Sequence, residues 1–301
     1  MEKTEILDFD TEEKEMEIQT LKPSKQRIKN KDLLIKLVFF FVNVFFCVFL
    51  VSLFLYYGKG ITVIYKNTTE LTLATIIILT RIGIMFSFCY YMFKKWFAQE
   101  KRYLKNIPFL VGLFFYFSAI GKFLDILLYI YYFSPYKEAD AFFLLAKIRQ
   151  LFLIITFIPM LYLGLRPFIY NIGLKRGWND LKVLKIRRGL TTTYVFSFGF
   201  FILIAYTIIF FQILTALMSI FTYVFICYLF RFAYKHNTFP TIRAELVSLG
   251  FLFYLISTPS RLILPIFLLG ILSLEQINVI SESLDFISMS VIFLGFVLKP
   301  K

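Results

Sequence analysis

Long apolar stretches alternate with short polar segments along nearly the whole chain after residue 32. Each stretch has about the 20 residues that an α-helix needs to cross the hydrocarbon core of a bilayer. The pattern predicts eight transmembrane helices, at residues 33–57, 71–93, 108–133, 142–164, 191–211, 214–234, 245–272 and 278–298. We therefore expect an all-α, polytopic membrane protein whose residues 33–298 form one helical domain.

The boundary between the fifth and sixth predicted helices has the weakest sequence signal. Residues from Thr191 to Phe230 carry no charge and no proline, and Gly199 is their only glycine. A single helix over these residues would be about 60 Å long, about twice the thickness of the hydrocarbon core. We expect a tight turn near Phe211–Thr215, marked by Gln212.

Lys and Arg are distributed unevenly between the polar segments. One alternating set, residues 22–32, 94–107, 165–190, 231–245 and 299–301, holds 22 of them, and the opposite set holds 3. Because cytoplasmic loops carry the excess of Lys and Arg, both termini are predicted to be cytoplasmic, which requires an even number of helices. The expected location is the plasma membrane, with the anionic lipids of the cytoplasmic leaflet as partners of the basic loops.

The first 32 residues have a different composition from the rest. Residues 1–20 hold eight acidic side chains against two lysines, so we expect them to be disordered. A basic collar follows between Lys22 and Lys31. The first apolar stretch is longer than the core of a signal peptide, so we expect a retained signal anchor.

Overall composition agrees with the membrane assignment. Hydrophobic residues make up 59% of the chain and the mean hydropathy is +0.75, both above the usual values for soluble domains. The net charge of +14 does not indicate a nucleic-acid partner, because the basic residues lie in short loops. In the longest interior loop, residues 166–189, Trp178 and Leu181 among cations suggest a short helix in the headgroup plane, as an anchor or a docking site.

Eight charged side chains fall inside the predicted helices, in the middle or outer half of the bilayer. They are Arg81, Lys122, Asp125, Lys147, Arg149, Arg261, Glu282 and Asp285. A charge at the centre of a membrane helix costs about 2.5–3.5 kcal/mol, so such residues normally face the interior of a bundle or an aqueous cavity. With five cations and three acids, a shared pocket would favour an anionic guest.

Spacing along the helices separates these residues into groups. Lys122 and Asp125 are three positions apart and can pair on one helix face, and Glu282 and Asp285 likewise share a face. Lys147 and Arg149 are two apart and point in different directions. We assign Arg149 to the site, because Lys147 is shallow enough to extend to the interface.

The seventh predicted helix contains two prolines beside a charge. Pro259 and Pro265 each remove an intrahelical hydrogen bond, and Arg261 lies between them. Non-helical backbone at membrane depth persists only where it is buried in protein or lines a cavity. We expect a kinked or locally unwound segment that acts as a hinge.

Residues for catalysis, metal binding or cofactor binding do not cluster in the sequence. His236 is the only histidine, and Cys47, Cys89 and Cys227 are scattered over three predicted helices. Neither a zinc site nor a Ser-His-Asp triad fits this pattern, and no nucleotide-binding motif occurs. We expect no metal, no cofactor and no catalytic residue, and an enzyme is the less favoured interpretation.

These patterns predict a protein that binds or transports an anionic or amphipathic small molecule or lipid headgroup, as a transporter or a sensor. Arg81, Arg149 and Arg261 are expected to contact the anion. The Lys122 and Asp125 pair is expected to adjust the electrostatics of this anion site. Glu282 and Asp285 complete the expected site. The alternatives are a lipid-modifying membrane enzyme and a scaffold subunit whose buried charges only pair with one another.

Overall fold

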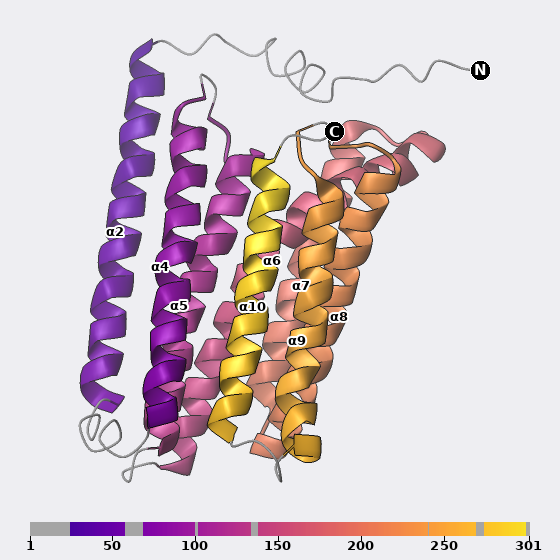
Figure 1. The fold of residues 1–301 in the computed structure, drawn as a ribbon. Helices are drawn as coiled ribbons and strands as arrows, with labels where there is room; N and C mark the ends of the chain where they lie inside the picture. Colours follow the sequence, from indigo (N-terminus) through magenta and orange to yellow (C-terminus); the bar gives the residue numbers. More distant parts are fainter. Residues whose placement is uncertain are drawn as a thin grey trace. The chain divides into compact units, whose positions relative to one another are not determined.

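The computed structural model describes residues 25–57, 69–99, 102–133, 138–239, 241–268 and 274–298. Their secondary structure consists of helices without strands (Figure 1). The helices are α2 (Lys25–Tyr57), α4 (Thr69–Phe97), α5 (Ile107–Phe133), α6 (Ala139–Lys175), α7 (Asp180–Ile204), α8 (Ile208–Lys235), α9 (Ala244–Leu268) and α10 (Leu274–Val297). Helix α2 belongs to one compact unit, and the helices from α4 to α10 form a second.

Six helices of the described part are long and apolar enough to cross a membrane: α2, α4, α5, α6, α8 and α10. The apolar stretch described in α9 is shorter, Ala244–Ser257, and α7 begins with several charged residues. The fold is all-helical and compatible with an integral, multi-pass membrane protein. The count of eight spans and the cytoplasmic termini stay predictions.

The turn between α7 and α8 lies earlier than predicted. Helix α7 ends at Ile204, the backbone is extended at Ala205, and α8 begins at Ile208. Thr207 caps α8, since its hydroxyl accepts a hydrogen bond from the backbone N–H of Phe210 at 3.3 Å. Gln212, which was expected to mark the turn, lies inside α8, so the expectation of a turn at Phe211–Thr215 is wrong.

The basic segment after the fourth predicted span also differs from its prediction. Helix α6 continues to Lys175, and α7 begins at Asp180 after a short turn. Gly177 adopts a positive φ of 62° in this turn, and the Asn179 side chain caps α7 by accepting from the N–H of Lys182. The cations of residues 166–189 therefore extend two long helices and form no separate helix in the headgroup plane.

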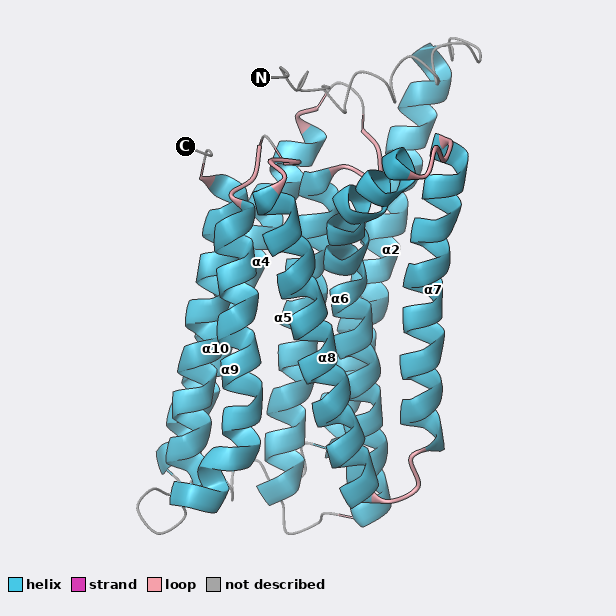
Figure 2. Cartoon of the chain, turned by 90° about the vertical axis from the view of Figure 1, so that its right-hand side faces the viewer, coloured by secondary structure: helices cyan, strands magenta, loops and turns pink. Residues whose placement is uncertain are grey.

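Within the second unit, six helices form a closed ring. Each contacts the next in the order α4, α5, α6, α8, α9, α10, and α10 returns to α4. Helix α7 packs against α6 and α8 and lies at the edge of the group (Figure 2). The ring brings side chains from six helices towards one interior.

Helices α9 and α10 approach each other closely through two glycines. A Cβ atom on Gly250 would lie 2.9 Å from both the Ser288 carbonyl oxygen and the Ile292 backbone nitrogen. The carbonyl of Gly295 accepts a hydrogen bond from the backbone N–H of Arg243 at 2.8 Å. Small residues allow such close packing between membrane helices. Helices α9 and α10 are therefore a closely packed pair within the ring.

The second unit has two ends that differ in charge. The Thr207 end carries the α7–α8 turn, and the Arg176 end carries the α6–α7 turn. Cations gather at the Arg176 end, among them Lys94, Lys95, Arg102, Lys105, Lys175, Arg176, Lys182, Lys185, Arg188, Arg231, Lys235 and Arg243. By the distribution of Lys and Arg, the Arg176 end is predicted to be cytoplasmic and the Thr207 end external.

Candidate functional site

Arg81 of α4 forms the most deeply buried ion pairs of the ring. Its Nη1 lies 2.8 Å from Oε2 of Glu282 and 3.0 Å from Oδ2 of Asp285, both on α10. Its Nη2 donates to the hydroxyl oxygen of Tyr254 on α9 at 2.6 Å. The two acids lie three positions apart and share a face of α10. One guanidinium therefore ties three helices together.

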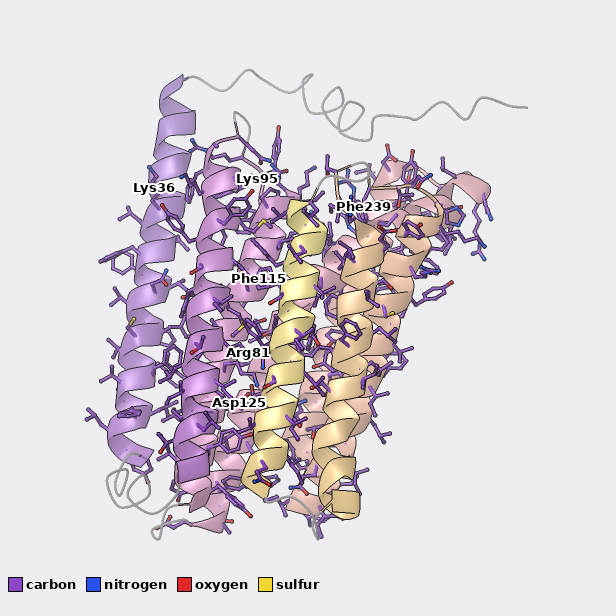
Figure 3. The ribbon with its side chains drawn as sticks, in the orientation of Figure 1. Lys36, Arg81, Lys95, Phe115, Asp125 and Phe239 are labelled. Atoms are coloured by element: carbon purple, nitrogen blue, oxygen red, sulfur yellow. The ribbon has the colours of Figure 1, made fainter. Side chains whose placement is uncertain are left out.

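Lys122 of α5 continues this network. Its Nζ lies 2.8 Å from Oε1 of Glu282 and 2.8 Å from Oδ2 of Asp125, and 3.7 Å from Oδ2 of Asp285. The predicted pairing of Lys122 with Asp125 is thus present, and it is joined to the acids of α10. Figure 3 shows Arg81 and Asp125 between Phe115 and the Thr207 end.

Arg149 of α6 occupies the more accessible edge of the network. Its Nε lies 2.6 Å from Oδ1 of Asp125, and its Nη2 donates to Oδ2 at 3.3 Å. Its Nη1 donates to the side-chain oxygen of Gln150 at 3.2 Å. The Arg149 side chain is 21% exposed, whereas that of Arg81 is 2% exposed. Arg149 is therefore the most exposed cation among the described members of the network.

Among the described side chains, the network contains equal numbers of opposite charges. Its members are three cations, Arg81, Lys122 and Arg149, and three acids, Asp125, Glu282 and Asp285. The predicted excess of positive charge stays a prediction, because the side chain of Arg261, one of the predicted cations, lies outside the described residues. Lys147 lies elsewhere, where its Nζ donates to the carbonyl of Leu203 and approaches the ring of Phe143.

The predicted hinge and one predicted site residue remain without a structural test. The backbone of α9 is helical through Pro259 and Pro265 to Leu268. The side chains of residues 258–268, including Arg261, lie outside the described part of the chain. The kink and the role of Arg261 stay predictions.

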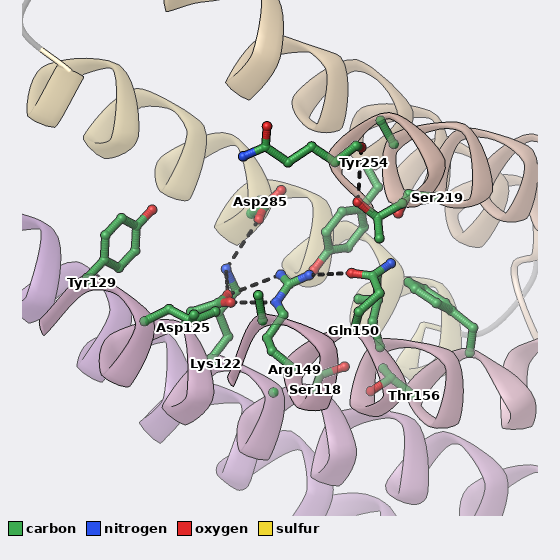
Figure 4. A pocket seen from close by; sticks show the side chains of 18 of the residues that line it. Ser118, Lys122, Asp125, Tyr129, Arg149, Gln150, Thr156, Ser219, Tyr254 and Asp285 are labelled. Atoms are coloured by element: carbon green, nitrogen blue, oxygen red, sulfur yellow. Dashed lines mark hydrogen bonds and ion pairs between the residues drawn. The ribbon is translucent and has the colours of Figure 1, made fainter. Parts of the chain in front are cut away.

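A pocket of about 500 Å³ adjoins the charge network. It receives lining residues from each of the six ring helices, and extends to Tyr132 near the end of α5 and Ile208 at the start of α8, so it reaches towards the Thr207 end. Its charged wall consists of Arg81, Lys122, Asp125, Arg149 and Asp285. The last four are labelled in Figure 4. Its apolar wall consists of Leu128, Phe142, Ala146, Leu153, Phe157, Ile208, Phe211, Ala216 and Met289.

One buried hydroxyl on the pocket wall lacks a hydrogen-bond partner within the described residues. The Ser118 hydroxyl is buried and has no hydrogen-bond partner there. Gln150 also lines the pocket and is 5% exposed, and its side-chain oxygen accepts from Arg149 (Figure 4). Buried polar groups are normally hydrogen-bonded, so an unpartnered one at a cavity indicates a site for a guest atom.

Aromatic side chains fill the ring between the pocket and the Arg176 end. This aromatic cluster consists of Phe114, Phe157, Tyr223, Phe230, Phe251 and Tyr254, and all six are buried. Tyr223 stacks on Tyr254 with ring centroids 5.3 Å apart, and Phe157 meets Tyr223 edge-on at 5.1 Å. Phe251 lies 6.3 Å from Phe230 and 6.0 Å from Phe114. The pocket is therefore closed on this side.

Sequence reasoning missed the neutral members of the site. Tyr254 and Ser257 of α9 bind the network, the latter by donating to Oδ1 of Asp285 at 2.5 Å. Nothing in the sequence separates Tyr254 from the other tyrosines of an aromatic-rich chain. Gln150 did carry a signal, because an amide beside Arg149 in an apolar span is itself a polar group that needs a partner.

No family model matches the chain, and neither a curated protein nor a solved structure matches it. Among the described residues, no group of three or more His, Cys, Asp or Glu is placed to hold a metal ion. The functional argument therefore rests on the pocket and its wall.

Proposed function

We propose that the chain is a multi-pass protein of the plasma membrane that binds a small amphipathic molecule in this pocket, as a transporter or a sensor. The observation that supports it is the joining of a charged wall and an apolar wall around one cavity of about 500 Å³. Small-molecule sites are commonly about 300–1,000 Å³, mostly apolar, with a few convergent polar groups. Arg81, Arg149, Lys122 and Asp125 form the polar side of the proposed site.

An amphipathic guest would satisfy both walls at once. Its headgroup would lie against Arg149 and Gln150, and its hydrocarbon part against residues such as Phe142 and Phe211. If the termini are cytoplasmic, the pocket opens towards the exterior or the outer leaflet. The guest would then enter from that side.

The aromatic cluster bears on the choice between transport and sensing. A transporter must open a second path to the Arg176 end, and the cluster closes that path in this conformation. A sensor needs only a change in helix packing when the pocket fills. A scaffold would share the paired charges but would have no use for a cavity beside them.

Binding of a neutral amphipath tests the proposal. The probe is 1-octanoyl-glycerol, titrated into the purified chain in nanodiscs of zwitterionic lipid, with calorimetry as the readout. Ala216→Phe adds bulk inside the pocket, whereas Leu217→Phe adds it one residue later at an exposed position. We expect saturable binding that Ala216→Phe abolishes and Leu217→Phe preserves. Equal binding by both variants would place the probe outside the pocket and contradict the proposal.

A further inference from the structure

The charge balance of the pocket wall bears on the chemistry of the guest. This step rests on the proposed function and narrows it to one ligand class. From the paired charges, the unpartnered Ser118 hydroxyl and the Gln150 amide on the wall, we infer that the pocket selects an amphipath whose headgroup carries no net charge. Ser118 and Gln150 supply the hydrogen bonds that such a headgroup needs.

Each charge on the wall already has a partner of opposite sign. Arg149 binds Asp125, Lys122 binds Asp125 and Glu282, and Arg81 binds Glu282 and Asp285. These side chains are almost fully buried except for Arg149. A charged guest would therefore add an uncompensated charge to a poorly solvated site, which is strongly unfavourable.

An anionic headgroup has an additional competitor. Arg149 is the most accessible cation of the network, and Asp125 already holds its Nε and Nη2. A carboxylate or sulfonate could bind Arg149 only by displacing Asp125. Asp125 would then keep Lys122 as a partner, and Lys122 also binds Glu282. The free energy lost when a buried ion pair is broken exceeds the free energy gained from the new contact with the guest.

The neutral polar groups suit an uncharged headgroup. The Gln150 amide nitrogen can donate two hydrogen bonds, and the Ser118 hydroxyl can donate one and accept others. Both line the pocket together with the hydroxyl-bearing Thr156 and Ser219. Hydroxyl, ester or amide groups on the guest would satisfy these atoms without changing the charge of the wall.

Three octyl probes that differ in headgroup charge test this inference in zwitterionic nanodiscs. They are 1-octanoyl-glycerol, octanesulfonate and octyltrimethylammonium. We expect the neutral probe to bind at least about tenfold more tightly than either ion. Gln150→Leu should weaken the neutral probe by about three- to tenfold, because the headgroup loses its amide donor.

Changes to the charge balance should switch the preferred probe. Asp125→Asn leaves the six described charges of the network with one excess cation and should favour the sulfonate. Arg149→Gln leaves one excess acid and should favour the ammonium, and the double variant should restore the neutral preference. Asp140→Asn is the matched control for Asp125→Asn, because it removes an exposed acid at the start of α6 and should change nothing.

The outcomes separate this inference from the proposed function. In one contrary outcome, the unaltered chain binds an ion more tightly than the neutral probe, and Ala216→Phe blocks that binding. This result would overturn the inference and leave the proposed function standing. A preference for the neutral probe that is unchanged in both Asp125→Asn and Arg149→Gln would overturn the role of charge balance. Failure of every probe to bind would overturn the proposed function and the inference with it.

Discussion

Arg81 on α4 and Glu282 on α10 are 201 positions apart in the sequence and meet at 2.8 Å between Nη1 and Oε2. Both side chains are at most 2% exposed. Their contact joins the first and last helices of the six-helix ring. The same glutamate also receives Lys122 of α5, so three helices depend on one carboxylate.

Glu282→Gln should strongly destabilise the fold. The substitution removes the negative charge between Arg81 and Lys122 and leaves two buried cations with Asp125 and Asp285. Breaking a buried ion pair costs about 3–5 kcal/mol. Unfolding in mixed micelles with increasing SDS measures the loss. Glu138→Gln is the control, since Glu138 is exposed, and equal losses in the two variants would contradict the assigned network.

The two arginines of the wall should respond differently to neutralisation. Arg81→Gln should cost about 3–5 kcal/mol, because its acids would stay buried and partly unpaired. Arg149→Gln should cost less, about 1–2 kcal/mol, since its side chain is 21% exposed and water replaces part of the interaction. The same SDS titration compares them. A larger loss for Arg149→Gln would mean that the burial of the network is wrongly assigned.

Much of the site could be predicted from depth alone. Charges in apolar spans must meet partners, and Arg81, Lys122, Asp125, Arg149, Glu282 and Asp285 do meet. The partners across helices could not be predicted, because they depend on which side chains point into the ring: Glu282 of α10 receives both Arg81 and Lys122. The ligand-binding role of these residues stays a proposal.

Fold boundaries were predictable where charged residues flank an apolar stretch and not elsewhere. The start of α5 agrees with the predicted span to within one residue. The α7–α8 turn depends on Thr207 as a cap, a local hydrogen bond that hydropathy does not report. Hydropathy also could not predict the length of α6, because the helix continues to Lys175 through polar residues in its last turns.

Substitution at Gly250 should weaken the α9–α10 pair. Alanine there would place Cβ 2.9 Å from backbone atoms of α10, which cannot move aside as a flexible side chain can. We expect Gly250→Ala to lower stability by about 1–3 kcal/mol. Gly199→Ala in α7 is the matched control, because nothing lies within 4 Å of the added Cβ. It should be neutral or stabilise by up to about 1 kcal/mol, as alanine favours helix. Similar effects at both positions would refute the close approach.

Opposite ends of the second unit should differ in their access to an impermeant thiol reagent. In a background with Cys47, Cys89 and Cys227 replaced by alanine, we expect Tyr206→Cys to be labelled on intact cells. His236→Cys should be labelled only after permeabilisation. Tyr206 is 82% exposed, and His236 follows α8 at the Arg176 end. The reversed pattern would invalidate the predicted orientation, and the same pattern at both sites would invalidate the span count.

Photolabelling locates the guest most directly. A diazirine placed on the alkyl chain of 1-octanoyl-glycerol is activated in the nanodisc-bound protein, and the adducts are mapped by peptide mass spectrometry. The account predicts adducts on apolar lining residues such as Phe142 and Phe211, and their loss in Ala216→Phe. Adducts confined to outward-facing side chains such as Phe196 and Leu203, unchanged by Ala216→Phe, would contradict it.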